Sequence, residues 1–246
     1  MMTLEVFPTD GEAFEAAAAL VVERLRAADG PASVALAGGR VGRGVMVALA
    51  GRADLPWERI HWFWGDERCV PPGDPRSNVR LARESLLAPR VVPAERIHPP
   101  PLELEAPERI ATAYAAAVAE LPFFDLLLLG VGTNGHIASL MPGCAALGSS
   151  APVAAVPVAE VSEEPIVARV TITPSAIAAA RHVLVTVTGD AKATIVRRAL
   201  RPSEKEPAIP AQLVPPSERV TWIVDRAAAA ELLRDARPAP PGVGRV

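Results

Sequence analysis

The most restrictive feature of the sequence is an unbroken apolar run that leads into a glycine-rich turn. Four consecutive leucines, Leu126 to Leu129, are followed by Gly130, Gly132 and Gly135 in the stretch GVGTNGH. A run without alternating polar residues is typical of a strand that is buried on both faces, as in a covered parallel sheet. This stretch therefore predicts an inner strand of a parallel sheet.

Segments with strand patterns alternate with segments of helical periodicity along the chain. Such alternation predicts an α/β fold, with a mostly parallel sheet sandwiched between helices and right-handed crossovers. Asp10 is expected to cap the first helix and Asp190 a later one. The predicted strands are 33–36, 59–67, 124–132, 167–173, 182–189 and 220–225, and the predicted helices are 11–29, 42–52, 77–87, 107–121, a segment that opens at 173–174, 191–200 and a last one after residue 225.

The length of the chain favours a single domain. A chain of 246 residues, half of them hydrophobic, is long enough for one large α/β core. We expect residues 1–236 to form this domain. The last residues, 237–246, are rich in proline and glycine and are expected to be a disordered tail.

The charge and composition favour neither a nucleic acid nor a membrane as a partner. The formal net charge is −3, no apolar run is long enough to span a bilayer, and no signal-peptide pattern opens the chain. A cytoplasmic protein is therefore expected. Cys69 and Cys144 lie far apart in sequence and the four histidines are isolated, so neither a disulfide nor a metal site is predicted.

Polar and glycine-rich loops follow several of the predicted strands. In an open parallel sheet, ligands bind beyond the carboxyl ends of the strands. The loops that follow the strands here are AGGRVGRG, GDER, GVGTNGH and TGDAK. We therefore expect the functional site at this rim of the sheet.

The glycine-rich turn allows two functional interpretations. G-x-G-x-x-G after a strand is the pattern of a dinucleotide-binding turn, which also requires an acidic residue about 20 residues later. The next acidic residue here is Glu160, beyond a segment rich in alanine, serine and proline. Alternatively, the glycines present His136 to a ligand, because an imidazole suits general-base chemistry at neutral pH. A lone histidine at this place can also simply pack at a helix start.

Four longer blocks carry a resemblance to a known family. WFWGDERCVPPGDPRSN, LLGVGTNGHIASLMPG, RVTITPSAIAAARHVLVTVTGDAKA and VTWIVDRAAA resemble segments of the 6-phosphogluconolactonases, and LAGG adds the first strand, so nearly the whole chain is covered. The resemblance implies a Rossmann-like sheet that binds sugar phosphates rather than dinucleotides. It implies hydrolysis of a phosphorylated sugar lactone, 6-phospho-D-glucono-1,5-lactone, to 6-phospho-D-gluconate in the oxidative pentose phosphate pathway, with no metal or redox cofactor.

The resemblance also implies catalytic roles. His136 is the base that takes a proton from water, and Asn134 stands beside it. Asp66 and Arg68 line the site, where Arg68 neutralises charge on the substrate. An ion pair at the rim is the alternative role of Asp66. The family motif D-G-H is N-G-H here. Because a carboxylate beside a catalytic histidine stabilises the imidazolium, we expect either weaker activity or a charge supplied by Asp66 or Glu67.

For the phosphate, the resemblance implies the glycine-rich turn before a helix and two cations. Gly38 and Gly39 would offer backbone N–H groups at the helix start, and Arg169 and Lys192 would add charge. The family motif G-G-S-T-P is G-G-R-V-G here, so that hydroxyl donors are lost. Arg40 or Arg43 is expected to substitute with a charge-assisted contact.

Two other functions stay open at this point. An amino-sugar-phosphate deaminase or isomerase of the same superfamily is one, although the GDER block favours the lactonases. A sugar-phosphate sensor without turnover is the other. The sequence does not distinguish a monomer from a dimer.

Overall fold

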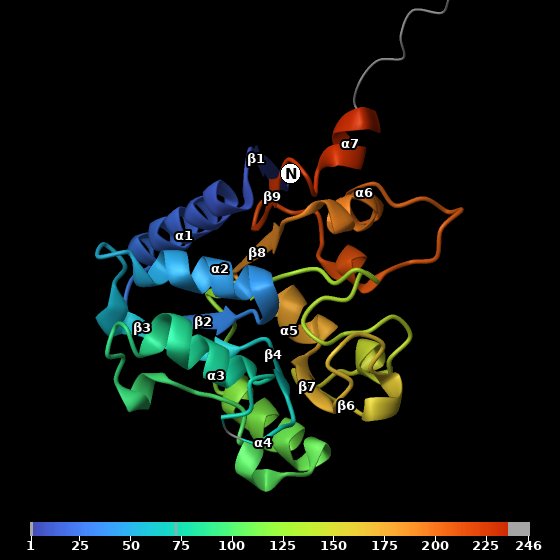
Figure 1. The fold of residues 1–246 in the computed structure, drawn as a ribbon. Coiled ribbons are helices and arrows are strands. Elements are labelled where there is room, and N and C mark those ends of the chain that lie inside the picture. The colour runs from blue at the N-terminus through green and yellow to red at the C-terminus, as the bar shows by residue number, and fades with distance from the viewer. Residues whose placement is uncertain (1, 72, 236–246) are drawn as a thin grey trace, which may run out of the picture.

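A six-stranded sheet forms the centre of the fold (Figure 1). The structure is a computed structural model that describes residues 2–71 and 73–235. All neighbouring strands in this sheet are parallel, as the sequence predicts. In spatial order the strands are β1 (Thr3–Phe7), β9 (Val220–Asp225), β8 (His182–Val187), β5 (Leu126–Leu129), β2 (Ala32–Leu36) and β3 (Ile60–Trp64).

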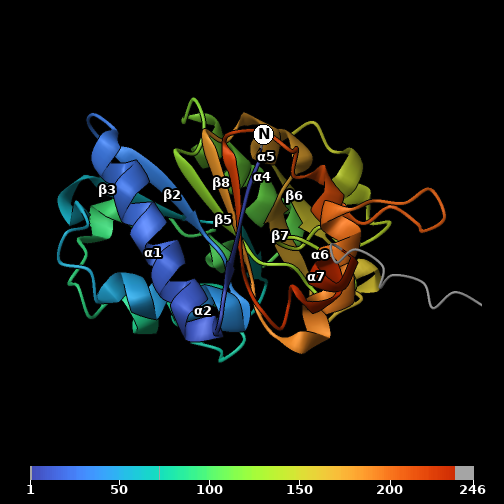
Figure 2. The ribbon, with the colours of Figure 1, turned by 90° about the horizontal axis from the view of Figure 1, so that it is seen from above.

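Helices cover both faces of this sheet. Figure 2 shows α1 and α2 on one side of the strands and α6 and α7 on the other. Side chains of α1, α2 and α3 share one hydrophobic core with the sheet, and those of α4, α5 and α6 share a second. The helices are α1 (Asp10–Ala27), α2 (Gly39–Ala50), α3 (Asn78–Ala82), α4 (Pro107–Ala119), α5 (Pro174–Ala179), α6 (Ala193–Leu200) and α7 (Ala230–Asp235).

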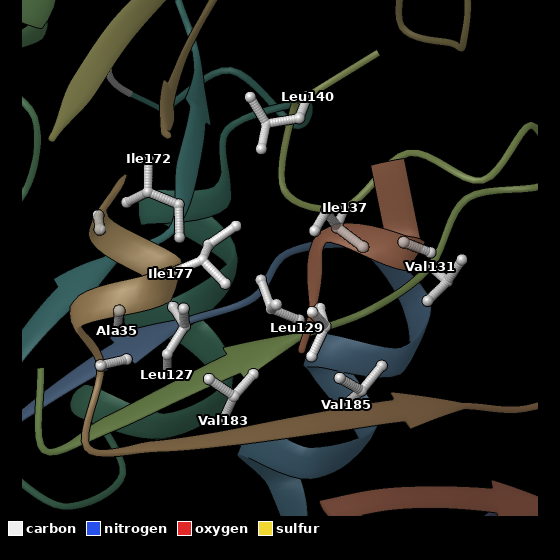
Figure 3. Close-up of a cluster of buried hydrophobic side chains, with 14 of the residues drawn as sticks. Ala35, Leu127, Leu129, Val131, Ile137, Leu140, Ile172, Ile177, Val183 and Val185 are labelled. Atoms are coloured by element: carbon white, nitrogen blue, oxygen red, sulfur yellow. The ribbon is translucent and has the colours of Figure 1, made fainter. Parts of the chain in front are cut away.

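The four leucines of β5 divide between the two cores. Successive side chains of a strand point to opposite faces, so Leu126 and Leu128 pack with α1 and α2. Leu127 and Leu129 belong to the opposite core, where Figure 3 shows them on the same side as Ile177 of α5. An apolar run without alternation is therefore what this strand requires.

A second, three-stranded antiparallel sheet packs on the core of α4 and α5. It consists of β4 (Asp66–Arg68), β7 (Arg169–Ile172) and β6 (Val153–Val156). The segment 59–67, predicted as one strand, is therefore divided at Gly65 into β3 of the large sheet and β4 of the small one. Its chain leaves the large sheet at Gly65, whose N–H donates to Leu36 while its carbonyl accepts from Ile172. One face of the large sheet is consequently covered by strands as well as helices.

Smaller differences from the predictions lie at strand and helix ends. The edge strand β1 and the strand β6 were not predicted. Thr9, not Asp10, is the N-cap of α1, because its hydroxyl accepts from the N–H of Glu12. Asp190 lies in a short 3-10 turn, Asp190–Lys192, and α6 begins after it, with Lys192 as N-cap.

The predicted tail, 237–246, lies outside the described residues. Within the part of the chain that the structure describes, none of the helices combines the length and the apolar character that a membrane span requires.

Leu127→Ala is expected to lower the free energy of unfolding by about 2–5 kcal/mol, because a fully buried side chain is lost from the centre of the sheet. Urea denaturation measures this change. The control is Val47→Ala on α2, where the side chain is 55% exposed and the change should stay within about 0.5 kcal/mol. Equal effects of the two substitutions would contradict the assignment of β5 to the core.

Candidate active site

A cavity of about 250 Å³ lies at the carboxyl ends of the parallel strands. From β2 the chain moves to β3 on one side, and β5 later pairs with the other side of β2. Such a switch point is where open parallel sheets bind ligands. Residues 37–41 after β2 and 130–132 after β5 both line the cavity.

The cavity brings together most of the residues that the sequence analysis singled out. Asn134 is the exception, and it contacts the ring of His136 instead. Glu163 and Glu164 also line the cavity and lie outside the predicted loops, whereas Thr188 belongs to the predicted TGDAK loop. The predicted residues that line it are Gly38, Gly39, Arg40, Asp66, Arg68, His136, Arg169 and Lys192.

The glycine-rich turn after β5 is shaped around His136. Gly135 has a φ of 86°, which favours glycine. A side chain at Gly132 would overlap the imidazole. The Gly132 N–H donates to the carbonyl of His136 at 2.9 Å, and the Gly135 N–H donates to the carbonyl of Gly132 at 3.0 Å. The glycines therefore let the turn close tightly against the histidine ring.

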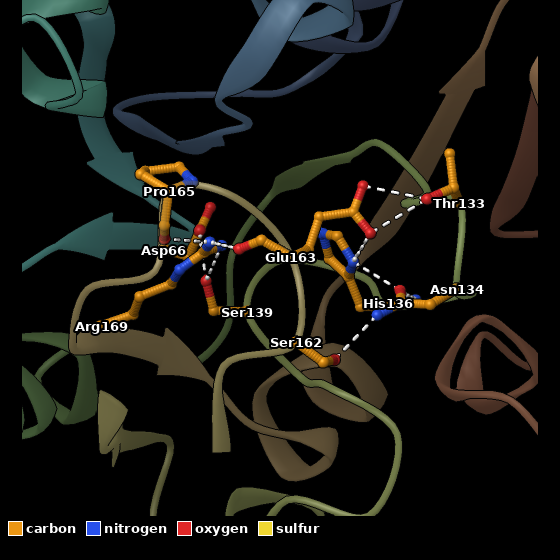
Figure 4. A network of polar contacts seen from close by, with 9 residues as sticks. All are labelled: Asp66, Thr133, Asn134, His136, Ser139, Ser162, Glu163, Pro165 and Arg169. Atoms are coloured by element: carbon orange, nitrogen blue, oxygen red, sulfur yellow. Dashed lines mark hydrogen bonds and ion pairs between the residues drawn. The ribbon is translucent and has the colours of Figure 1, made fainter. Parts of the chain in front are cut away.

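Asn134 fixes the orientation and the tautomer of the imidazole (Figure 4). Its Oδ1 accepts the backbone N–H of His136 at 3.0 Å and lies 2.8 Å from Nδ1 of the ring. Because a backbone N–H can only donate, the atom that faces it is the amide oxygen, and Nδ1 must then carry the proton. The other ring nitrogen, Nε2, is left unprotonated and able to accept a proton.

A carboxylate from another loop approaches the same ring. Glu163 Oε2 lies 3.9 Å from His136 Nδ1, with side-chain exposures of 28% and 15%. The hydroxyl of Thr133 contacts both carboxylate oxygens of Glu163, at 3.1 and 3.0 Å. Sequence analysis missed Glu163, because it lies in a loop without a motif and comes near the histidine only in the folded chain.

Burial lowers the pKa of His136 from 6.5 to about 4. The charges of Glu163 and Asp66 oppose this shift because they stabilise the imidazolium, while those of Arg169 and Lys192 add to it. Loss of water around the ring has the largest effect, since burial disfavours the charged form. The ring is therefore neutral at physiological pH.

Asp66 and Glu67 have different surroundings, although both are buried. Glu67 accepts hydrogen bonds of 2.6 to 2.8 Å from three backbone N–H groups and the hydroxyl of Ser77, and so holds the start of α3. Of the two carboxylates expected to supply charge to His136, Asp66 acts on the ring, whereas Glu67 is engaged at the start of α3. Asp66 Oδ2 accepts from Ser139 Oγ at 2.6 Å. Among the residues that the structure describes, Asp66 forms no ion pair within 4 Å. In the same part of the chain, no group of three or more Asp, Glu, His or Cys side chains is arranged to hold a metal ion.

Two arginines lie opposite each other on neighbouring strands of the small sheet. Arg68 of β4 and Arg169 of β7 are directly paired residues. Arg169 is 1% exposed and donates to the carbonyls of Glu163 and Pro165, at 2.5 and 2.9 Å. Like charges directly opposite each other are unfavourable in a sheet. Burial also lowers the pKa of Arg169, so this part of the cavity is well suited to negative charge.

The start of α2 forms another part of the cavity. Gly38 is the N-cap of this helix, and no side chain in the described ranges caps it. Uncapped N–H groups at a helix start attract anions. The Arg40 guanidinium, however, turns back to Thr188 and Asp10: one nitrogen donates to the carbonyl and hydroxyl of Thr188 at 2.9 and 2.8 Å, and another to Asp10 at 3.1 Å.

Lys192 also lines the cavity. Among the residues that the structure describes, none accepts a hydrogen bond from its ammonium group. Burial lowers the pKa of Lys192, and the charge of Arg40 adds to this effect, whereas Glu163 opposes it. The ammonium group is therefore available to an anionic ligand.

Several proteins are similar to this chain in sequence over most of its length. The 6-phosphogluconolactonase of Streptomyces coelicolor is 37% identical, over 91% of this chain and 92% of its own. The protein of the same name from Nostoc sp. is 33% identical, over 94% of this chain and 98% of its own.

Solved structures share the fold. The 6-phosphogluconolactonase of Trypanosoma brucei superposes with a TM-score of 0.85 at 30% identity, over 94% of this chain and 99% of its own. A monomeric glucosamine-6-phosphate deaminase superposes with a TM-score of 0.78 at 23% identity, over 94% of this chain and 100% of its own, which shows the common fold alone. Residues 8–222 match the family model described as glucosamine-6-phosphate isomerases/6-phosphogluconolactonase. The chain belongs to this family.

Proposed function

We propose that the chain hydrolyses 6-phospho-D-glucono-1,5-lactone to 6-phospho-D-gluconate. Relatives with more than 30% identity over most of the chain, such as those from Streptomyces coelicolor and Nostoc sp., are named 6-phosphogluconolactonases. The observation that carries the proposal is one cavity that holds a neutral imidazole with a free Nε2 together with an uncapped helix start and a half-buried lysine. These groups match a water-activating base and a phosphate site.

In the proposed reaction, His136 Nε2 takes a proton from a water molecule as the water oxygen attacks C1 of the lactone. The carbonyl oxygen becomes an oxyanion, and the guanidinium groups of Arg68 and Arg169 stabilise its charge. Arg169, which the resemblance implies for the phosphate, is proposed here instead because it is paired with Arg68. The bond from C1 to the ring oxygen then breaks, and the imidazolium returns its proton to that oxygen. A positioned base typically contributes a factor of ~10²–10⁴ to the rate.

The phosphate of the substrate is proposed to bind at the start of α2 and at Lys192. Backbone N–H groups there replace the hydroxyl donors that the G-G-R-V-G turn lacks. The donors of Arg40 are partly engaged with Thr188 and Asp10. Its role is therefore proposed to be the placement of the turn as well as the supply of charge.

A coupled assay for 6-phosphogluconate tests the function directly. Because the lactone also opens spontaneously, the protein must accelerate the reaction above the rate in buffer. Release of ammonia from glucosamine 6-phosphate, without lactone hydrolysis, would instead assign the chain to the deaminase branch of the family. Binding of sugar phosphate without either reaction would indicate a sensor.

His136→Ala is expected to reduce kcat by at least about 10²-fold, because the base is lost. Steady-state kinetics measure the change, and circular dichroism checks that the variant is folded. The control is His182→Ala, since His182 begins β8 and lies at the strand end away from the cavity. Near-normal turnover of a folded His136→Ala protein would contradict the role of this residue.

Lys192→Ala is expected to raise KM for the phosphorylated lactone at least about tenfold, with kcat little changed, because a charge-assisted contact to phosphate is lost. KM for unphosphorylated glucono-1,5-lactone should not change. The matched control is Lys205→Ala, which removes the only other lysine of the chain from an exposed loop. A parallel rise of KM for both lactones would speak against phosphate binding at Lys192.

The pH dependence of kcat/KM is expected to show an acid limb near pH 4. Catalysis requires unprotonated Nε2, so activity is constant well above the His136 pKa of about 4 and is lost as the pH falls through it. Initial rates corrected for spontaneous hydrolysis measure this limb, with circular dichroism at each pH as the control. An acid limb close to the ordinary histidine pKa of 6.5 would contradict the burial effect.

A further inference from the structure

We propose that Glu163 supplies the negative charge that Asn134 lacks and so stabilises the imidazolium of His136. Only the kinetic consequences of this inference rest on the proposed function. Glu163 is a positioning residue in this scheme, since it acts on the substrate through the histidine.

The first observation is that the neighbour of the ring is an uncharged amide. Asn134 Oδ1 accepts both the backbone N–H and the Nδ1–H of His136. This contact orients the ring and sets its tautomer as a carboxylate would. It adds no charge when the ring becomes an imidazolium during the reaction.

The second observation is that Glu163 is held at the ring from two sides. Thr133, which precedes Asn134 in the turn, donates its hydroxyl to the Glu163 carboxylate. The amide nitrogen of Asn134 donates to Ser162 Oγ at 3.0 Å, which ties the turn to the residue before Glu163 (Figure 4). These bonds keep the carboxylate 3.9 Å from Nδ1 of His136. The Glu163 charge is thereby held at a fixed distance from the imidazole, too far for a direct hydrogen bond to the ring.

The third observation concerns the other charged groups that act on His136. Asp66 favours the imidazolium as well, but less than Glu163 does, while Arg169 and Lys192 disfavour it. Asp66 is also committed to a hydrogen bond with the buried hydroxyl of Ser139. Glu163 is therefore the main counter-charge to the two cations. An opposite charge at this distance shifts a pKa by roughly 1–3 units in partly buried sites.

Titration of the His136 ring by NMR tests the inference without any substrate. Ring ¹⁵N shifts report the fraction of imidazolium even when the midpoint is not reached, and His136→Ala assigns the signals among the four histidines. In Glu163→Gln, which keeps the size and an acceptor for Thr133, the ring should protonate at a pH lower by about one unit. Glu164→Gln is the matched control and should leave the ring titration in place. An unchanged titration in Glu163→Gln would overturn the inference.

Kinetics give the second arm of the test. Glu163→Gln is expected to lower kcat about three- to tenfold with an unchanged KM, since the counter-charge matters when the ring is protonated. Addition of Asn134→Asp to this variant should restore kcat, because the carboxylate then stands at the other side of Nδ1. A lowered KM with unchanged kcat would mean that the Glu163 charge only weakens the attraction of Lys192 for the substrate, and it would overturn the inference.

The two arms separate this inference from the proposed function. A protein without lactonase activity would refute the proposed function, and the ring titration would still decide whether Glu163 sets the protonation of His136.

Discussion

Parallel hydrogen bonding between β2 and β5 is the interaction on which the cavity depends. The two strands meet at Val34–Leu126 and Ala35–Leu127, and the loops that follow them separate beyond the sheet. A strand in this place is buried on both faces, so only an apolar run can occupy it. The loops at its end are then free to carry polar groups, and the site is a consequence of where these two strands end.

Partial exclusion of water determines the chemistry of the cavity. Burial alone lowers the pKa of an imidazole, an ammonium and a guanidinium, and the pKa values of His136, Lys192 and Arg169 are all lowered. A neutral imidazole and cations that lack full hydration are both suited to an anionic ligand. The negative charge of a phosphate would replace part of the hydration that these cations have lost, which favours binding.

Much of the fold follows from local patterns, and much of the cavity does as well. The leucine run predicts β5, and the loops after β2, β3, β5 and β8 all line the cavity, as expected from the ends of parallel strands. The second strand after Gly65 was not predictable, because Gly, Asp and Glu are poor strand formers and only the pairing with β7 makes Asp66–Arg68 a strand. Glu163 was not predictable either, since its distance to His136 arises from tertiary contacts rather than from spacing in sequence.

The pairing of β4 with β7 has a consequence for how this site can vary. Arg68 lies opposite Arg169 and Asp66 lies opposite Thr171 in a ladder of only three residue pairs. Side chains in a ladder alternate between faces, so one residue inserted or deleted after Gly65 would turn Asp66 and Arg68 away together. The same amino acids would remain in the chain, yet the cavity would lose the carboxylate of Asp66 and the guanidinium of Arg68 at once. In the segment GDER, length is therefore a stricter constraint than any single side chain.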